Sequence, residues 1–293
     1  PNPDLKWERT GQFDIGLDLG LFNNRLRITT DYYKKKTTDL LYSVAVPATS
    51  GYQTMLKNIG SIENQGYELS IESDNLTGAF SWTTAFNIAF NRNKVLELGG
   101  EEYKEMAEGD GHLKTGSVRR LIVGEPIGVF YGYRFDGIFQ NEEECKQQTS
   151  SASPIGVGLR RYKDLNGDGK VDAANDREIL GDANPKFFGG LTNTFAYKGF
   201  ELNVFLQYSY GNKILNYNAM ELENPTGGQN AYADMVNRWT PENPSNIYPK
   251  ATTNRALLVS DRFIEDGSYL KLKTLSLSYS FPKINLKHIQ GLR

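Results

Sequence analysis

A run of oxygen-bearing side chains, DLNGDGKVDAAND, begins at Asp164 and has the spacing of a calcium-binding loop. Asp164, Asn166 and Asp168 fall at positions 1, 3 and 5, Gly169 falls at the sharp turn of position 6, and Lys170 offers its carbonyl at position 7. Hard oxygen ligands at alternate residues converge on one cation only where the chain turns sharply, and glycine permits that turn. The spacing predicts a structural calcium site.

The end of this loop leaves the closing ligand open. Position 9 is Asp172, a usable ligand, but position 12 is Asn175, and the stronger candidate Asp176 comes one residue later. The same residues can form an Asx-rich turn without metal, because Asn and Asp side chains bond their own backbone. The candidate calcium ligands are Asp164, Asn166, Asp168, Lys170, Asp172 and Asp176, and the metal-free turn is the alternative.

Other chemistry is sparse. The two histidines, His112 and His288, lie far from any plausible catalytic partner in sequence, and the single Cys145 allows neither an internal disulfide nor a zinc cluster. We expect no enzymatic activity. A long polar segment offers Trp239 and Tyr248 as stacking surfaces for a sugar, with asparagines nearby as donors; the alternative is that both rings anchor loop packing.

Composition sets the fold class. Gly 29, Tyr 17 and Phe 15 against Met 4 indicate a turn-rich, all-β chain. A formal net charge of -2 gives no basic footprint for nucleic acid. No run approaches the ~18 apolar residues of a spanning helix, but barrel strands need only alternation over segments of about 10 residues.

Segments with period-two hydrophobicity supply the elements that must position these sites. Three hairpins are predicted, with turns at Asn23, near Asn75 and at Lys198, from residues 12–21 with 25–33, 66–73 with 80–90, and 187–197 with 200–210. Residues 128–139 and 269–281 supply further strands. In the last of them the apolar face changes phase between Leu272 and Leu275, which predicts a bulge.

Connection lengths alternate between these short turns and the long segments 36–62, 92–125, 140–185 and 212–265. Outer-membrane barrels have short periplasmic turns and long extracellular loops, whereas soluble sandwiches seldom hold several such loops. Aromatic residues near strand ends suit interfacial girdles: Tyr32–Tyr33, Trp82, Tyr131–Tyr133, Tyr208–Tyr210 and Tyr279–Phe281. A soluble β-sandwich with these rings in its core is the alternative.

Segments along almost the whole chain resemble, in order, the C-terminal half of SusC/RagA-type TonB-dependent transporters of the Bacteroidota: NPDLKWERTGQFDIGLDLGLFNNRLRITTDYYKKKTTDLL, VGEPIGVFYGYRFDGIFQ, DLNGDGKVD, GDANPKFFGGLTNTFAYKGFELNVFLQYSYGN, NRWTPENP and DRFIEDGSYLKLKTLSLSYSFP. The resemblance implies an antiparallel transmembrane barrel of about 22 strands, an N-terminal plug, a SusD-like lipoprotein lid and energy supplied through TonB. We expect residues 1–293 to be a C-terminal portion of that barrel domain, because the eight to ten strands counted are too few to enclose a plugged lumen of about 22 strands. The plug, the TonB box and the last strands are expected outside this sequence.

The expected function is active import of a nutrient across the cell outer membrane. Oligosaccharides are the first substrate class and peptides the second. The expected partners are a SusD-like lipoprotein, TonB, the oligosaccharide or peptide ligand and outer-membrane lipid, with no nucleic acid. A soluble β-rich adhesin or glycan-binding module and a passive porin are the rival functions.

Overall fold

The computed structural model describes residues 2–45, 51, 54–106, 117–223, 230–253 and 258–281. The chain divides into two compact units: residues 1–101, 184–212 and 267–293 form the first, and residues 102–183 and 213–266 form the second. Most described residues lie in strands, as the composition predicts. No helix among them is long and apolar enough to cross a membrane.

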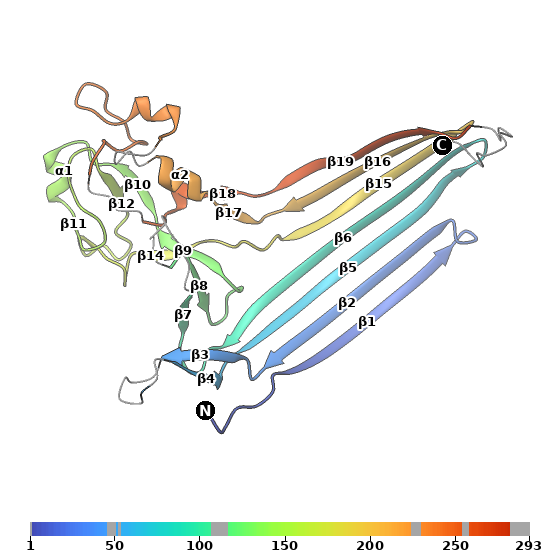
Figure 1. The fold of residues 1–293 in the computed structure, drawn as a ribbon, viewed down its shortest axis with the longest axis horizontal. Coiled ribbons are helices and arrows are strands. Elements are labelled where there is room, and N and C mark those ends of the chain that lie inside the picture. The colour runs from blue at the N-terminus through green and yellow to red at the C-terminus, as the bar shows by residue number, and fades with distance from the viewer. Residues whose placement is uncertain are drawn as a thin grey trace. The chain divides into compact units, whose positions relative to one another are not determined.

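The first unit is built on a seven-stranded antiparallel sheet in the order β1-β2-β5-β6-β15-β16-β19 (Figure 1). Its strands are β1 (Arg9–Leu21), β2 (Leu26–Thr38), β5 (Ser61–Thr77), β6 (Phe80–Glu97), β15 (Phe187–Tyr197), β16 (Phe200–Tyr210) and β19 (Tyr269–Tyr279). A small hairpin of β3 (Leu41–Ala45) and β4 (Thr54–Asn58) accompanies it. All three predicted hairpins are confirmed.

The register of this sheet separates apolar from polar side chains. Directly paired residues in an antiparallel sheet point to the same face. One row across the seven strands is entirely apolar: Leu19, Ile28, Ile71, Phe86, Leu191, Leu206 and Leu272. The neighbouring row faces the other way and is entirely polar or small: Asp18, Thr29, Ser70, Asn87, Gly190, Gln207 and Lys271.

A bulge in β19 keeps its apolar residues on one face. Phe205 pairs with Thr274, whereas Leu206 pairs with Leu272, so Lys273 is the extra residue. Without this shift, strict alternation from Leu275 would turn Lys273 and Lys271 onto the apolar face. The bulge predicted from the phase change is confirmed.

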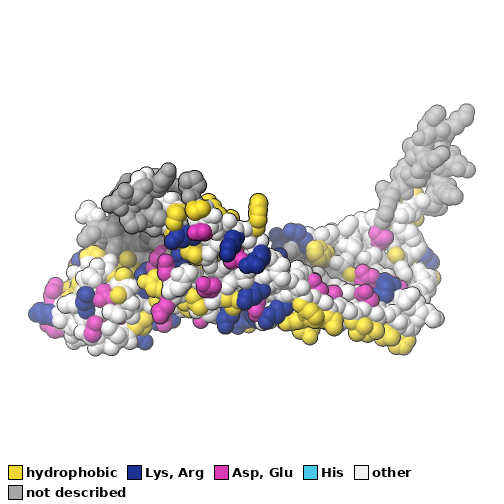
Figure 2. Space-filling view, turned by 90° about the horizontal axis from the view of Figure 1, so that it is seen from below, with side chains coloured by type: hydrophobic (Ala, Val, Ile, Leu, Met, Phe, Trp, Pro, Cys, Tyr) yellow, Lys and Arg dark blue, Asp and Glu magenta, His cyan; other side chains and the backbone are white. Residues whose placement is uncertain are grey.

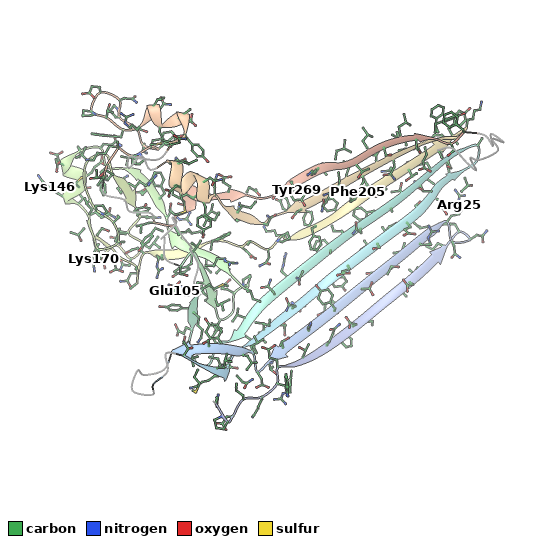
Figure 3. All side chains as sticks on the ribbon, in the orientation of Figure 1. Arg25, Glu105, Lys146, Lys170, Phe205 and Tyr269 are labelled. Atoms are coloured by element: carbon green, nitrogen blue, oxygen red, sulfur yellow. The ribbon has the colours of Figure 1, made fainter. Side chains whose placement is uncertain are left out.

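Phe205 is the one apolar residue of β16 on the polar face, and a glycine accommodates it. A Cβ added to Gly190 would lie 2.7 Å from Phe205 Cε2. The ring of Phe205, labelled in Figure 3, therefore lies against the backbone of β15. Such a contact covers the bare glycine and helps to fix the register of the two strands.

Short turns join the strands at one end of the sheet. Asn23 and Asn24 have φ of 58° and 62°, and Lys198 and Gly199 have φ of 46° and 87°. Tight hairpin turns need positive φ at both central residues, and Asn and Gly tolerate it best. Local sequence therefore sets these turns.

The second unit gathers the long connections around a core of its own. Its main sheet has the order β14-β9-β8-β7, from β7 (Tyr103–Met106), β8 (Arg119–Ile122), β9 (Val129–Tyr133) and β14 (Arg177–Gly181). The remaining elements are β10 (Phe135–Ile138), α1 (Glu142–Lys146), β11 (Thr149–Ser150), β12 (Arg160–Tyr162), β13 (Lys170–Val171), β17 (Lys213–Leu215), α2 (Tyr217–Leu222), η2 (Ala233–Asn237), η3 (Asp261–Phe263) and β18 (Ile264–Asp266). Buried Phe130, Met220, Val259 and Phe263 belong to the core that holds them.

Two expectations change here. Residues 128–139 form two short strands, β9 and β10, in the second unit, so the long sheet has seven described strands where eight to ten were counted. The girdle assignment of Tyr131–Tyr133 is wrong, because Tyr133 is buried against Tyr162 in the second unit. Amphipathic pattern alone cannot tell a lipid-facing aromatic from a core one.

We predict that Leu206 faces lipid near the middle of the bilayer. Leu206→Arg should lower the free energy of unfolding in lipid vesicles by about 2 to 4 kcal/mol, because an arginine there meets hydrocarbon. Gln207→Arg, one residue along on the polar face, is the control and should cost far less. A spin label at position 206 that a water-soluble relaxing agent reaches more readily than oxygen does would contradict the assignment.

Candidate functional site

The predicted calcium loop connects β12 to β14, and Asp164 organises its first half. The carboxylate of Asp164 accepts hydrogen bonds from the backbone amides of Gly167 at 2.7 Å and Gly169 at 2.6 Å. Gly169 has φ of 81°, the left-handed conformation that favours glycine. The turn expected at position 6 is therefore present.

Asp176 closes the loop. Its side chain is fully buried; Oδ1 accepts from the amide of Leu165 at 2.8 Å and Oδ2 from the amide of Asp172 at 2.7 Å. Asn175 instead donates its backbone amide to Asp172 Oδ1 at 3.0 Å. Asp176 thus holds the end of the loop through backbone hydrogen bonds. The choice of Asp176 over Asn175 as the closing ligand of a cation stays a prediction.

The remaining candidates also bond within the loop. Asp168 accepts from the Lys170 amide at 2.8 Å and from Asn166 Nδ2 at 2.9 Å. Lys170 Nζ forms an ion pair with Asp172 at 3.1 Å. The Asn175 amide, and then the Lys170 ammonium, hold the pKa of Asp172 below its usual range.

Donors suited to calcium are thus gathered, but hydrogen bonds already hold them. Asn166 and Asp168 are exposed and bonded to each other, and Asp164 lies on the same turn. Within the described ranges, no group of three or more His, Cys, Asp or Glu side chains is arranged to hold a metal. The oxygen types fit calcium, and the hydrogen bonds fit the metal-free turn equally well.

The two candidate stacking residues differ in what they expose. Trp239 is 9% exposed, donates from Nε1 to Gln140 Oε1 at 3.1 Å, and lies against Gly158, whose added Cβ would come within 2.6 Å of Cε3. Tyr248 is half-buried, and the Arg262 guanidinium lies 5.3 Å from its ring centroid. Trp239 thus packs as a loop anchor, and Tyr248 offers the more open ring; contact with a ligand or a partner stays a prediction for both.

A buried arginine in the second unit was missed from the sequence. Arg120 lies between the rings of Tyr103 and Tyr131, with Cζ 3.9 and 3.7 Å from their centroids. It forms an ion pair with Glu105, which Arg177 also contacts at 3.3 Å. Burial raises the pKa of Glu105, but the hydrogen bonds and charges of Arg120 and Arg177 outweigh burial and hold it below its usual range. In the structure, Glu105 and Arg120 are directly opposite each other in β7 and β8.

A second arginine cluster ties α2 to η3. Arg262 forms a largely buried ion pair with Glu223 at 2.7 Å. Arg160 donates to the Glu223 carbonyl at 3.1 Å, and burial lowers the pKa of Arg160. Residues far apart in sequence meet here, so periodicity and spacing could not reveal the cluster.

The polar face of the first unit holds a pocket of about 210 Å³ near the short turns. Arg27 forms ion pairs there with Glu72 at 3.0 Å and Asp74 at 3.5 Å. Thr83, Thr192 and Thr194, whose side chains lie on the same face, also line the pocket. His112 and His288 lie outside the described residues.

Comparisons with known proteins show which proteins this chain resembles in sequence and in fold. Residues 1–116 match the family described as TonB dependent receptor-like, beta-barrel. The chain is 40% identical over 283 residues to TonB-dependent receptor P3 of Formosa agariphila, covering 96% of this chain and 28% of that protein. It is 29% identical to TonB-dependent receptor SusC of Bacteroides thetaiotaomicron, covering 97% of this chain and 27% of that protein. The structure of the RagAB peptide transporter matches with a TM-score of 0.77 at 26% identity, covering 99% of this chain and 31% of that one.

The chain resembles the SusC/RagA-type TonB-dependent receptors. It spans less than a third of the length of the curated relatives named above. The seven-stranded sheet is therefore part of a receptor barrel wall, which confirms the predicted family and fold class. The relatives are receptors and transporters, not enzymes, in agreement with the expectation for this chain.

We predict that Glu105 stabilises the second unit in a pH-dependent way. Because the folded pKa of Glu105 is lowered, its contribution is present above the unfolded pKa of about 4.3 and is lost as pH falls through the folded pKa. Glu105→Gln should cost about 1 kcal/mol at neutral pH, a low value because the carboxylate is over a third exposed.

The measurement is the unfolding midpoint of the purified receptor as a function of pH. Glu242→Gln, at an exposed loop position of the same unit, is the control and should leave the midpoint unchanged. A midpoint difference for Glu105→Gln that persists at acid pH would show that the ion pair is not its cause.

Proposed function

We propose that this chain forms part of the wall and extracellular loops of an outer-membrane importer that takes up a nutrient with energy supplied through TonB. The observation that carries the proposal is the register of the sheet, in which an entirely apolar row across seven strands lies next to an entirely polar or small row that faces the other way. A barrel wall must present apolar side chains to lipid and can present polar ones to a water-filled lumen. Its similarity to TonB-dependent receptors supports active import over a passive porin.

The proposed mechanism is transport without bond chemistry. Substrate binds between a SusD-like lipoprotein lid, the folded loops of the second unit and the plug, and it passes when TonB pulls the plug. The polar face supplies hydrogen-bonding groups along that route, among them the hydroxyl groups beside Arg27 and Glu72. Low-affinity polar contacts suit passage, because a substrate held tightly in the lumen would not leave it.

Oligosaccharides are the first proposed substrate class and peptides the second. The sugar proposal rests on Tyr248 and the polar loop around it, since the Trp239 ring is packed away. The likeness to the RagAB peptide transporter favours the peptide class. Growth on purified oligosaccharides or on peptides as the sole carbon source, in a strain with and without the receptor, decides between them.

We predict that the tip of the loop between Trp239 and Tyr248 is needed for uptake. The Trp239 amide donates to the Tyr248 carbonyl at 3.0 Å, so these two residues bracket residues 240–247. Replacing residues 240–247 with a Gly-Gly pair should abolish uptake of the substrate, because the tip meets the lid or the substrate. Receptor level in the outer membrane is the control and should be normal. Unchanged uptake with normal insertion would remove this loop from the import route.

Calcium binding by the loop from Asp164 to Asp176 is also proposed, in a structural role on the extracellular side. Extracellular calcium modules bind with dissociation constants of about 10⁻⁴ to 10⁻³ M. A ligand present at about 100 times its dissociation constant stabilises the folded state by about 2.7 kcal/mol. Added calcium should therefore raise the unfolding midpoint of the receptor.

The calcium prediction is tested with two variants. Asp168→Ala removes an exposed ligand and should abolish the calcium response while changing the calcium-free midpoint little. Asp176→Asn replaces an oxygen that accepts a backbone amide and should lower the calcium-free midpoint as well. If Asp168→Ala responds to calcium as the unmodified receptor does, the loop is the metal-free turn.

A further inference from the structure

Basic side chains follow the last apolar row on the apolar face of the sheet, at the end where the long connections emerge. The last apolar row across β2, β5 and β6 is Tyr32, Tyr67 and Phe90. The next row on the same face is Lys34, Gln65 and Arg92, and the one after it is Lys36, Glu63 and Lys94. Beyond the aromatic row, the next two rows on this face therefore consist mainly of basic side chains.

The aromatic row continues onto β15 and β16. Phe187 lies 5.8 Å from Phe90 and 5.1 Å from Tyr210 between ring centroids, which extends the aromatic row to β16. Arg92 Nη1 contacts the backbone carbonyl of Lys186 at 3.3 Å. We call Lys34, Lys36, Arg92 and Lys94 the basic belt.

The basic belt carries a net positive charge and is open to its surroundings. All four side chains are exposed. Glu63 is the carboxylate among them and forms an ion pair with Lys34 at 3.1 Å. Within the part of the chain that the structure describes, the other three belt residues form no ion pair.

The short-turn end of the same face is different. There Asn75 donates to Thr84 at 2.8 Å, Thr84 donates to Asn193 at 2.7 Å, and Trp82 Nε1 donates to Asn193 at 2.8 Å. This network is uncharged. Figure 2 shows a band of hydrophobic side chains on the sheet and Lys and Arg side chains gathered at an end of that band.

We propose that the basic belt binds the phosphate groups of lipid headgroups in the membrane leaflet at the long-loop end. The proposal rests on the proposed function, because it requires the sheet to stand in a membrane. Aromatic rows mark the edge of the hydrocarbon layer, and two residues along a strand advance about 7 Å, which is the depth of a headgroup. Long basic side chains reach such groups while their stems cover apolar surface.

The positive charge of the basic belt favours a phosphate-bearing lipid as its ligand. The belt is continuous with the apolar band, so a partner that covers both must join an apolar part to an anionic part, as a phosphate-bearing lipid does. A basic side chain near an anionic membrane surface contributes a factor of about five in binding. Removing two of the side chains should therefore weaken binding roughly 25-fold.

The test uses the full-length receptor in detergent micelles and follows its unfolding midpoint during titration with phosphatidic acid. Arg92→Gln/Lys94→Gln removes two belt charges and keeps an amide that can still donate to the Lys186 carbonyl. Lys35→Gln/Lys271→Gln removes two charges from the polar face of the same sheet and is the matched control. Lipid-free midpoints show that both variants fold.

Phosphatidic acid should raise the midpoint with a roughly 25-fold weaker apparent affinity in the belt variant and an unchanged affinity in the control. Diacylglycerol and inorganic phosphate should give no shift. Equal affinities in the two variants would overturn the proposal, as would an equal shift from inorganic phosphate or from an acidic peptide. Nutrient uptake is measured separately: a receptor that imports nothing overturns the proposed function, while the titration in micelles still decides the belt.

Discussion

The pairing register of the long sheet is the constraint on which the rest of the first unit depends. Side chains on a strand alternate with a period of two, so a slip of one residue would turn every apolar row to the polar face. A one-residue slip of any strand would break the row from Leu19 to Leu272. Three local devices hold it: the positive-φ turns at Asn23–Asn24 and Lys198–Gly199, the contact of Phe205 with Gly190, and the bulge at Lys273.

The second unit is stabilised differently from the first. Its described segments are connections and contribute no strand to the long sheet. Long loops lose more conformational entropy on ordering than short ones, and the loss must be offset by burial and by bonds. Arg120, Arg160 and Arg262 are each sequestered beside aromatic rings and acceptors. Removing the partner of a buried arginine leaves its charge buried and unpaired, which is strongly destabilising. These contacts therefore favour the one loop arrangement in which every buried arginine keeps its partners.

Sequence reasoning succeeded where the determining interactions are local. A few neighbouring residues determine the hairpin turns, the alternation of apolar and polar side chains, and the phase change at Leu272–Leu275. Each of these features is present in the structure. It failed where segments distant in sequence meet. The pattern at residues 128–139 is amphipathic in either unit. The burial of Trp239 depends on Gln140, 99 residues before it in the chain, and on Gly158, contacts that only the fold brings about.

The loop from Asp164 to Asp176 shows how a metal-like spacing and a metal-free turn share one geometry. Each carboxylate oxygen carries two lone pairs, so accepting one backbone amide does not prevent it from ligating a cation. The amides that bond Asp164 and Asp176 already hold the loop in its closed form. In small metal-dependent domains a cation folds the loop that binds it, but here the loop would already be folded. A bound cation would instead be ligated by the exposed Asn166 and Asp168 and make their turn more rigid. Calcium should thus act on the rigidity of the connection between β12 and β14, with little change in its path.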